Sequence, residues 1–270
     1  MIDIVTAYFD IGREHWTEYR RTKSEYMSFF RRVCRLENRI VVYTSPDLVS
    51  EISAIRPDLR VIPVEDYTRL YVGLLDRIAA VQKSPEFIRR TGGATNPEYI
   101  HPEYVLVVYL KWHFVHDAIL AGHVRSDMVA WIDFGYGRSD DVVPCRSWNY
   151  GFDKDKIHFF GVRELPEDID VEATALTNDV YIQGGHVVAS RSNFIYLKHR
   201  MFETLHGYLN KGIVDDEQSA LLSLYMEERD ICEYHLFNTM DPWDWFRIFK
   251  DYNEPLGSSA VESRPSQCHK

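Results

Sequence analysis

Short apolar runs alternate with amphipathic segments through the first half of the chain. The runs are rich in β-branched and aromatic residues, which predicts strands at residues 2–9, 39–44, 60–64 and 128–133. Between them, apolar side chains recur at helical spacing or follow a Ser-Pro start, which predicts helices at residues 16–36, 45–55, 68–82 and 102–120. This alternation is typical of βαβ crossovers and a mainly parallel sheet.

The second half has shorter apolar runs separated by glycine-containing turns. The pattern predicts strands at residues 157–162, 180–183 and 186–190. It predicts helices at residues 192–209 and 215–228, with Ser192 and Asp215 as N-caps. We therefore expect one α/β domain over residues 1–253, with a mixed, mainly parallel central sheet flanked by helices. Residues 254–270 form a polar tail that is expected to be disordered.

Composition restricts the partners and the compartment. The chain has a formal net charge of −10 at pH 7, which argues against a protein that covers nucleic acid or anionic lipid through its overall field. The cysteines are far apart and form no Cys-x-x-Cys pair, as expected of free thiols in a reducing compartment. No charged leader precedes the first strand, so no signal peptide is expected. The sequence predicts a cytoplasmic protein without a nucleic-acid partner.

The carboxylate at the end of the fourth predicted strand is the most informative residue. Asp133 follows Trp131 and Ile132 and precedes Phe134 and Gly135, which places its side chain at the carboxyl edge of the sheet. Ligands bind at that edge in open α/β sheets, and a carboxylate there can hold Mg²⁺ or Mn²⁺ beside a diphosphate. The spacing is equally consistent with an aspartate that caps a turn. Protein kinases share the Asp-Phe-Gly string, but the other kinase motifs are absent.

Three further groups accompany this carboxylate along the chain. Lys111, on the preceding predicted helix, can neutralise a phosphate, although a solvated helix face is the commoner place for a lysine. Gly184 and Gly185 permit close backbone approach to a ligand or form a tight turn. Asp215 and Asp216 open a predicted helix, where capping explains Asp215 and a general-base role is open to Asp216.

Two strings connect this order of motifs with a known family. Residues 4–13 read IVTAYFDIGR, and residues 131–138 read WIDFGYGR. On these strings, and over nearly all of its length except the polar tail, the chain resembles the HtrL/YibB family, which is found largely in bacteria near surface-polysaccharide genes. That family in turn resembles glycosyltransferases of the GT-A fold. The resemblance implies a Rossmann-like domain with a nucleotide-binding half at residues 1–135 and an acceptor and sugar half at residues 136–253.

The resemblance also implies the residues of the donor site. Those implied to bind a nucleotide sugar are Thr6, Tyr8, Asp10, Arg13, Lys111, Asp133, Gly135, Arg138, Gly184 and Gly185. Asp133 matches the first acid of the Asp-x-Asp pattern that receives a metal-bound diphosphate, whereas Gly135 replaces the second. The implied metal ligands are Asp133 and His235, with Mn²⁺ or Mg²⁺ as the cofactor. Arg138 or Lys111 can replace part of the charge of the metal by pairing with phosphate oxygens.

The implied activity is sugar transfer from a nucleoside diphosphate sugar, with a UDP-sugar favoured, to a hydroxyl of a surface polysaccharide or lipopolysaccharide-type glycan. In the GT-A fold an acid that opens a later helix faces the acceptor, which matches Asp216 first and Asp215 second. Asp216 would take the acceptor proton if configuration is inverted. Peripheral association with the inner face of the membrane stays open.

Two functions of other classes remain open from the sequence. A metal-dependent phosphohydrolase would use His116, Asp117 and Asp133, although enzymes of this His-Asp type are usually all-helical. A catalytically inactive protein that binds nucleotides or sugars is the other alternative, because the second acid of the Asp-x-Asp pattern is missing.

Overall fold

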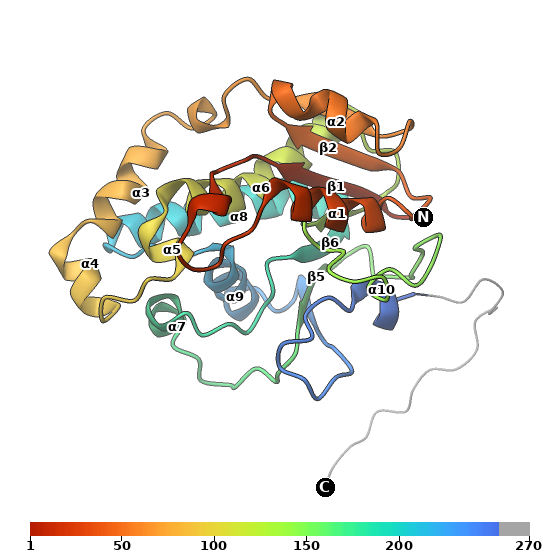
Figure 1. Cartoon of the computed structure of the whole chain (residues 1–270). Coiled ribbons are helices and arrows are strands. Elements are labelled where there is room, and N and C mark those ends of the chain that lie inside the picture. The colour runs from red at the N-terminus through yellow and green to blue at the C-terminus, as the bar shows by residue number, and fades with distance from the viewer. Residues whose placement is uncertain (254–270) are drawn as a thin grey trace, which may run out of the picture.

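Residues 1–253, which the computed structural model describes, fold around a seven-stranded mixed sheet (Figure 1). The tail at residues 254–270, expected from the sequence to be disordered, lies outside the described residues. The strands are β1 (Asp3–Tyr8), β2 (Ile40–Thr44), β3 (Arg60–Pro63), β4 (Met128–Ile132), β5 (Ile157–Gly161), β6 (His186–Ser190) and β7 (Cys232–Leu236). Their spatial order is β3-β2-β1-β4-β6-β5-β7, and β6 runs antiparallel to both of its neighbours. The predicted fold class, a mainly parallel mixed sheet flanked by helices, is confirmed.

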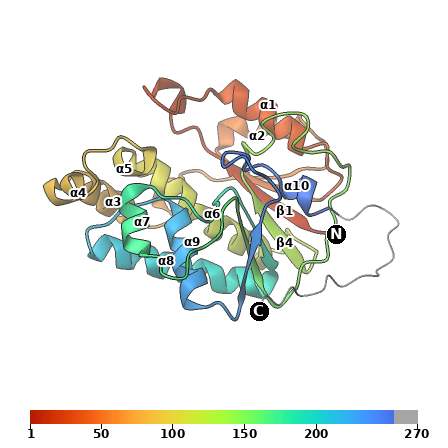
Figure 2. The same ribbon diagram turned by 90° about the horizontal axis from the view of Figure 1, so that it is seen from below.

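Helices cover both faces of this sheet (Figure 2). One face carries α1 (Lys23–Val33), α2 (Val49–Ser53) and α10 (Ile248–Asp251), and the other carries α3 (Leu74–Gln82), α6 (Pro102–Leu120), α8 (Arg191–Asn210) and α9 (Glu217–Glu227). Shorter helices lie in the connections: α4 (Pro85–Arg90), α5 (Pro97–Ile100), α7 (Val171–Thr177), η1 (Arg13–His15), η2 (Pro46–Leu48) and η3 (Tyr67–Arg69). The central strands are therefore buried on both sides.

The hydrophobic core is divided by the sheet into two halves. In β1, Ile4 packs with Phe30 of α1, whereas the next residue, Val5, packs with the side of the sheet that includes Val108 of α6. Successive strand side chains point to opposite faces, so a strand covered on both sides needs apolar residues throughout. This is why the strands read as nearly continuous apolar runs in the sequence.

Local capping explains where the predicted helices were too long. The helix predicted from residue 16 begins at Lys23, because Thr22 and Glu25 form a capping box that fixes the start one turn before the buried face. The helix predicted over residues 68–82 is divided at Gly73, whose φ of 77° ends one turn and starts the next. Ser190, rather than Ser192, caps α8.

Several elements in the second half differ from the prediction. The strand predicted at residues 180–183 does not form, while α7 and the edge strand β7 were not predicted. β7 combines polar and half-exposed residues, so its apolar pattern is weak, and it is a strand because it pairs with β5.

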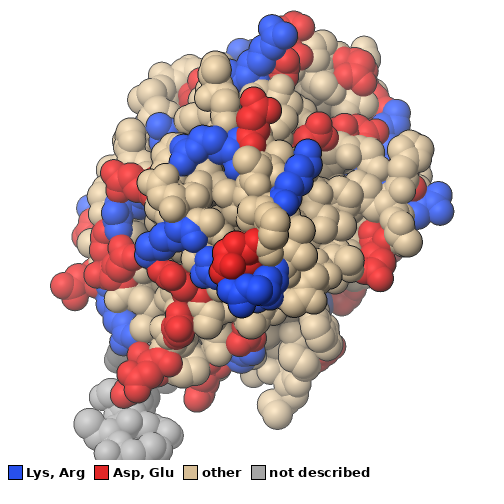
Figure 3. Space-filling view, turned by 90° about the vertical axis from the view of Figure 1, so that its left-hand side faces the viewer, with Lys and Arg blue, Asp and Glu red and all other residues tan. Residues whose placement is uncertain are grey.

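The length of the helices and the charge on one face are two further features of the fold. Within residues 1–253, none of the helices combines the length and the apolar character that a membrane span requires. On the face at the α4 end of the molecule, basic and acidic side chains are interspersed and form no large patch of one sign (Figure 3). Charge on that face therefore gives no indication of a polyanionic partner.

Candidate active site

A pocket of about 440 Å³ opens at the carboxyl end of β1 and β4. Its walls include residues 7–11 at the end of β1, part of α6, residues 133–136 after β4, residues 183–185 before β6 with His186 at its start, and the start of α9. Because β6 is antiparallel to β4, the segment that precedes β6 lies at the same sheet edge as the residues that follow β4. This is the edge at which open α/β sheets bind ligands.

Asp133 is held in place through one carboxylate oxygen and offers the other to the pocket. Its backbone N–H donates to the carbonyl of Gly185 (2.9 Å), which continues the pairing of β4 with β6. Oδ1 accepts from the indole N–H of Trp131 (2.7 Å) and lies 2.9 Å from Nζ of Lys111. Oδ2 accepts no hydrogen bond from the described residues, and the side chain is 39% exposed. Oδ2 is therefore available to a ligand hydroxyl or cation.

Lys111 projects from α6 beneath the pocket and is almost fully buried. Its ammonium contacts the carbonyl of Gly184 (2.9 Å), Oδ1 of Asp133 (2.9 Å) and Oε1 of Glu217 (2.5 Å). These contacts use all three N–H donors of a lysine. Burial opposes the charged form, but the two carboxylates outweigh it and raise the pKa of Lys111 above its usual range. Lys111 therefore positions two acids instead of facing a phosphate directly.

Glu217, the first residue of α9, provides the second carboxylate of the pocket. Oε1 is bound to Lys111, whereas Oε2 is buried and has no partner among the described residues. Burial raises the pKa of Glu217 to about 7, although Lys111 opposes the shift. A β-carbon on Gly184 would lie 1.8 Å from Oε1, so only glycine allows the carboxylate to approach the backbone here. The requirement for Gly184 is thus steric.

Three arginines provide positive charge in the pocket that contains the carboxylates of Asp133 and Glu217. Arg13, Arg21 and Arg138 line the pocket, and within residues 1–253 none of them forms an ion pair with a carboxylate. Arg13 donates to the hydroxyl of Tyr26 (2.8 Å), and the guanidinium of Arg138 packs against the ring of Phe246 (5.0 Å). Burial and the neighbouring Arg21 lower the pKa of Arg138 to about 10. The arrangement leaves positive charge uncompensated beside the pocket.

Several buried polar atoms in the pocket walls have no partner among the described residues. They are both amide atoms of Gln183, both ring nitrogens of His186, Nε of Arg13, Nε of Arg138, Oε2 of Glu217 and Oε1 of Gln218. A buried polar atom without a hydrogen bond costs roughly 1–3 kcal/mol. Their concentration in one pocket indicates that a polar ligand or water completes their hydrogen bonding.

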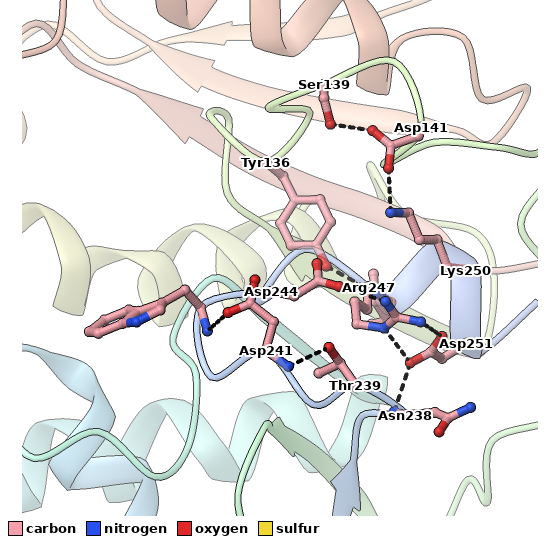
Figure 4. Close-up of polar contacts among 12 residues, drawn as sticks. Tyr136, Ser139, Asp141, Asn238, Thr239, Asp241, Asp244, Arg247, Lys250 and Asp251 are labelled. Carbon is pink, nitrogen blue, oxygen red and sulfur yellow. Dashed lines mark hydrogen bonds and ion pairs between the residues drawn. The ribbon is translucent and has the colours of Figure 1, made fainter.

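The segment between β7 and α10 contributes Trp245 to the pocket wall. Within it, Arg247 pairs with Asp244 (2.6 Å) and Asp251 (2.8 Å) (Figure 4). The hydroxyl of Tyr136 accepts a hydrogen bond from the first backbone N–H of α10 (3.1 Å). Because Tyr136 itself lines the pocket, this bond ties the segment to the loop that follows β4.

Comparison with known proteins assigns the chain to a family. The family described as "Bacterial protein of unknown function (HtrL_YibB)" matches residues 1–253. Protein HtrL of Escherichia coli (strain K12) is 35% identical over 261 residues, which cover 92% of this chain and 92% of HtrL. The chain belongs to the HtrL/YibB family.

Two similar solved structures are glycosyltransferases. Mouse xyloside xylosyltransferase 1, in its apo form, shares 9% identity with this HtrL/YibB protein and gives a TM-score of 0.40, with 93% of each chain covered. The glycosyltransferase GlyE of Streptococcus pneumoniae TIGR4 shares 10% identity with a TM-score of 0.39, over 87% of this chain and 46% of GlyE. At these values the two similarities by themselves assign no activity to the HtrL/YibB chain.

The structure brings most of the predicted donor-site residues together. Those that line the pocket are Tyr8, Asp10, Arg13, Lys111, Asp133, Gly135, Arg138, Gly184 and Gly185. Thr6 does not, because it is buried within β1 and the pocket lies beyond the strand end. Glu217, Gln183 and Arg21 were missed by the sequence analysis. The adjacency of Glu217 to Asp215 and Asp216 was the available signal.

The two predicted catalytic acids lie behind the pocket wall. Asp216 is the N-cap of α9, and its carboxylate accepts from the backbone and side chain of Gln218 (2.9 and 2.8 Å). Asp215 is also buried and does not line the pocket. Helix geometry therefore turns Glu217, rather than its two predecessors, toward the ligand space.

The predicted metal ligands are separated. His235 does not line the pocket of Asp133; it lies on β7 beside His158 and Glu233, and these three could hold a metal ion. Burial lowers the pKa of His235 to about 3. At Asp133 one oxygen is occupied by Trp131 and Lys111, and Gly135 supplies no second acid. Asp133 therefore offers a cation only Oδ2, which is a weaker site than the paired acids of an Asp-x-Asp pattern.

Residues of the phosphohydrolase alternative are also separated from Asp133. Asp117 accepts a hydrogen bond from the hydroxyl of Tyr43 (2.6 Å), and the ring of His116 lies against that of His199. Neither residue lines the pocket. Within residues 1–253, His116 and Asp117 therefore form no cluster with Asp133.

Proposed function

We propose that the protein is a glycosyltransferase that binds a nucleoside diphosphate sugar in the Asp133 pocket. The observation that carries the proposal is the group Arg13, Arg21 and Arg138, which line the pocket without a carboxylate partner. In a chain with a net charge of −10, unpaired arginines around one cavity favour a polyanionic ligand of matching size. A diphosphate fits this charge, and the acids of the same pocket suit the hydroxyls of a sugar.

The arrangement supports transfer without a metal at Asp133. Departure of the nucleoside diphosphate builds negative charge, which preorganised arginines stabilise in a site shielded from water. Oδ2 of Asp133 would accept a hydrogen bond from a hydroxyl of the donor sugar. Lys111 pairs with both Asp133 and Glu217 and so fixes their positions relative to each other. The unpartnered Oε2 of Glu217 takes the place that the sequence analysis gave to Asp216, as the carboxylate that receives or orients the acceptor hydroxyl.

The acceptor would approach over an aromatic rim. Trp243 is 74% exposed, and its ring centroid lies 5.8 Å from that of Trp245, which lines the pocket. Exposed indole faces beside a polar pocket suit the apolar faces of sugar rings. We accordingly assign residues 1–135 chiefly to the donor and residues 136–253 to the sugar and the acceptor, a surface glycan. Such an enzyme would work in the cytoplasm on a UDP-sugar or a related donor.

Nucleotide binding tests the proposal directly. Thermal unfolding would be followed with UDP, GDP and CDP, each in Mn²⁺ and in EDTA. We expect one diphosphate, UDP first, to raise the midpoint in EDTA as well as in Mn²⁺, because a ligand specific to the folded state stabilises it. Arg138→Ala should abolish the shift, and Arg191→Ala, which removes an exposed arginine paired with Asp127, should retain it.

Two results would count against the proposal. The absence of any shift with the three nucleotides would remove the donor site. A shift that requires Mn²⁺ would return a metal to Asp133 and contradict the assignment to the arginines.

Under the proposal, Glu217→Gln should separate donor binding from the transfer reaction. Donor affinity should be retained, and release of the nucleoside diphosphate in the presence of acceptor should be at least 100-fold slower.

A further inference from the structure

A second group of ligand side chains lies on the sheet edge formed by β5 and β7. His158 pairs with Glu233 in the register of these parallel strands, and His235 follows two residues later on the same face. Nδ1 of His158 lies 2.8 Å from Nε2 of His235 and 3.3 Å from Glu233. One ligand atom from each side chain lies within 4.8 Å of the others. Three potential ligands thus converge on one point.

The surroundings orient these rings for coordination. Nε2 of His158 lies 2.8 Å from the backbone carbonyl of Asp153, to which it can only donate, so the lone pair of Nδ1 is directed at His235 and Glu233. Such a hydrogen bond on the second ring nitrogen is typical of metal-binding histidines. The ring of His235 is stacked on Phe160 at 4.8 Å. His158 is fully buried, whereas Glu233 is 46% exposed, which leaves the cluster accessible from one side.

The spacing requires little adjustment. Zinc binds imidazole nitrogen at roughly 2.0–2.1 Å, so two nitrogens of a tetrahedral site are about 3.3 Å apart. The two nitrogens here, now 2.8 Å apart, would separate by about half an ångström to admit an ion. Glu233 already lies within reach of both histidines, at 3.3 and 4.0 Å.

We propose that His158, Glu233 and His235 bind a divalent transition metal of the zinc class. Two imidazoles and one carboxylate suit Zn²⁺ and its neighbours, whereas Mg²⁺ and Ca²⁺ prefer oxygen ligands. The site is separate from the donor pocket, since none of its three residues lines that pocket. Phe160 lies between the two sites, in contact with His235 on one side and with His186 of the pocket on the other.

The function that we assign to this metal is to fix the edge strand β7. Its ligands come from segments 75 or more residues apart, and β7 in turn leads into the segment that carries Trp243 and Trp245. An ion that joins β5 to β7 binds only the folded arrangement and therefore stabilises it. It would also hold the pocket wall that follows β7.

Zinc binding to the full chain tests this inference independently of nucleotide binding. Protein stripped of metal with a chelator would be titrated with Zn²⁺ by calorimetry, with Co²⁺ absorption as a readout of coordination. We expect one ion per chain and a higher unfolding midpoint. Glu233→Gln should weaken Zn²⁺ at least tenfold, and His235→Ala should abolish the site.

A matched control is His206→Ala, which removes an exposed histidine on α8. It should bind Zn²⁺ as the wild type does. Equal binding by wild type, Glu233→Gln and His235→Ala would overturn the inference, as would the absence of stoichiometric Zn²⁺ in the wild type. Glu233→Gln changes a half-exposed side chain, so it remains informative if His235→Ala does not fold. Asp133→Asn should leave Zn²⁺ affinity unchanged, which separates this site from the donor pocket.

Discussion

Two adjacent glycines in the pocket have different steric roles. A β-carbon at Gly184 would lie 1.8 Å from Oε1 of Glu217, whereas one at Gly185 would meet Oδ2 of Asp133 at an ordinary 3.7 Å. Moving the carboxylate of Glu217 away would cost free energy, because it is buried and bound to Lys111. Packing therefore requires glycine at position 184, whereas position 185 has room for a β-carbon.

Gly184→Ala should accordingly be far more harmful than Gly185→Ala. We expect Gly184→Ala to lower the free energy of unfolding by about 1–3 kcal/mol, as overpacking of a filled site does. Gly185→Ala should change the free energy of unfolding by less than about 1 kcal/mol, because the added methyl group meets no atom closer than van der Waals distance. Urea denaturation of both variants checks this. Similar losses in the two would show that the contact with Glu217 is not the cause.

At the scale of an element, the segment between β7 and α10 combines a rigid base with an exposed rim. Arg247 and its two acidic partners fix the base (Figure 4), and the side chain of Trp243 is 74% exposed. Under the proposed function, a glycan acceptor bound next to the pocket would cover this exposed ring.

Trp243→Ala should affect the acceptor and spare the donor. Loss of one stacked ring removes about 1 kcal/mol of binding, so KM for the acceptor should rise about fivefold with little change in kcat. The affinity for the nucleotide should stay at the wild-type value. Steady-state kinetics with varied acceptor, together with nucleotide titration, provide the measurement. An unchanged KM would remove Trp243 from the acceptor site.

At the scale of the whole molecule, the buried acids make stability depend on pH. Burial raises the pKa of Glu98, Asp216 and Glu217 each to about 7, and raises that of Asp215 well above its usual range. In the unfolded chain these groups titrate near pH 4. Between about pH 4 and pH 7 the folded state thus binds more protons at these groups than the unfolded chain does. The contribution of these groups to the free energy of unfolding therefore decreases as the pH rises from 4 to 7.

Glu98→Gln isolates one of these contributions without touching the pocket. Glu98 is 3% exposed, and its Oε1 has no partner among the described residues. The variant keeps the neutral form at every pH, so it should gain on the wild type as the pH rises from 4.5 to 7, by up to about 3 kcal/mol, and not further above 7. Urea denaturation between pH 4.5 and 8 checks this. A constant difference between variant and wild type would contradict the raised pKa of Glu98.

The sequence by itself determined the central sheet and one side of the site. Strands buried on both faces must be apolar throughout, so the apolar runs predicted β1, β2 and β4. A carboxylate that follows β4 had to lie at the edge of the sheet where ligands bind. Asp133 was found for this reason. Gly184 and Gly185 were found from a turn pattern between strands, and Arg13 was implied only by the resemblance to the family.

Only the tertiary structure decided which acids face the ligand and where the histidines meet. Asp215, Asp216 and Glu217 are three consecutive acids, and their order in the sequence does not show which one faces the pocket. The helix that Asp216 caps is oriented so that Glu217 lines the pocket. Lys111 is engaged by two carboxylates that are distant in sequence. His235 joins His158 because β7 pairs with β5, a long-range contact that no local propensity encodes.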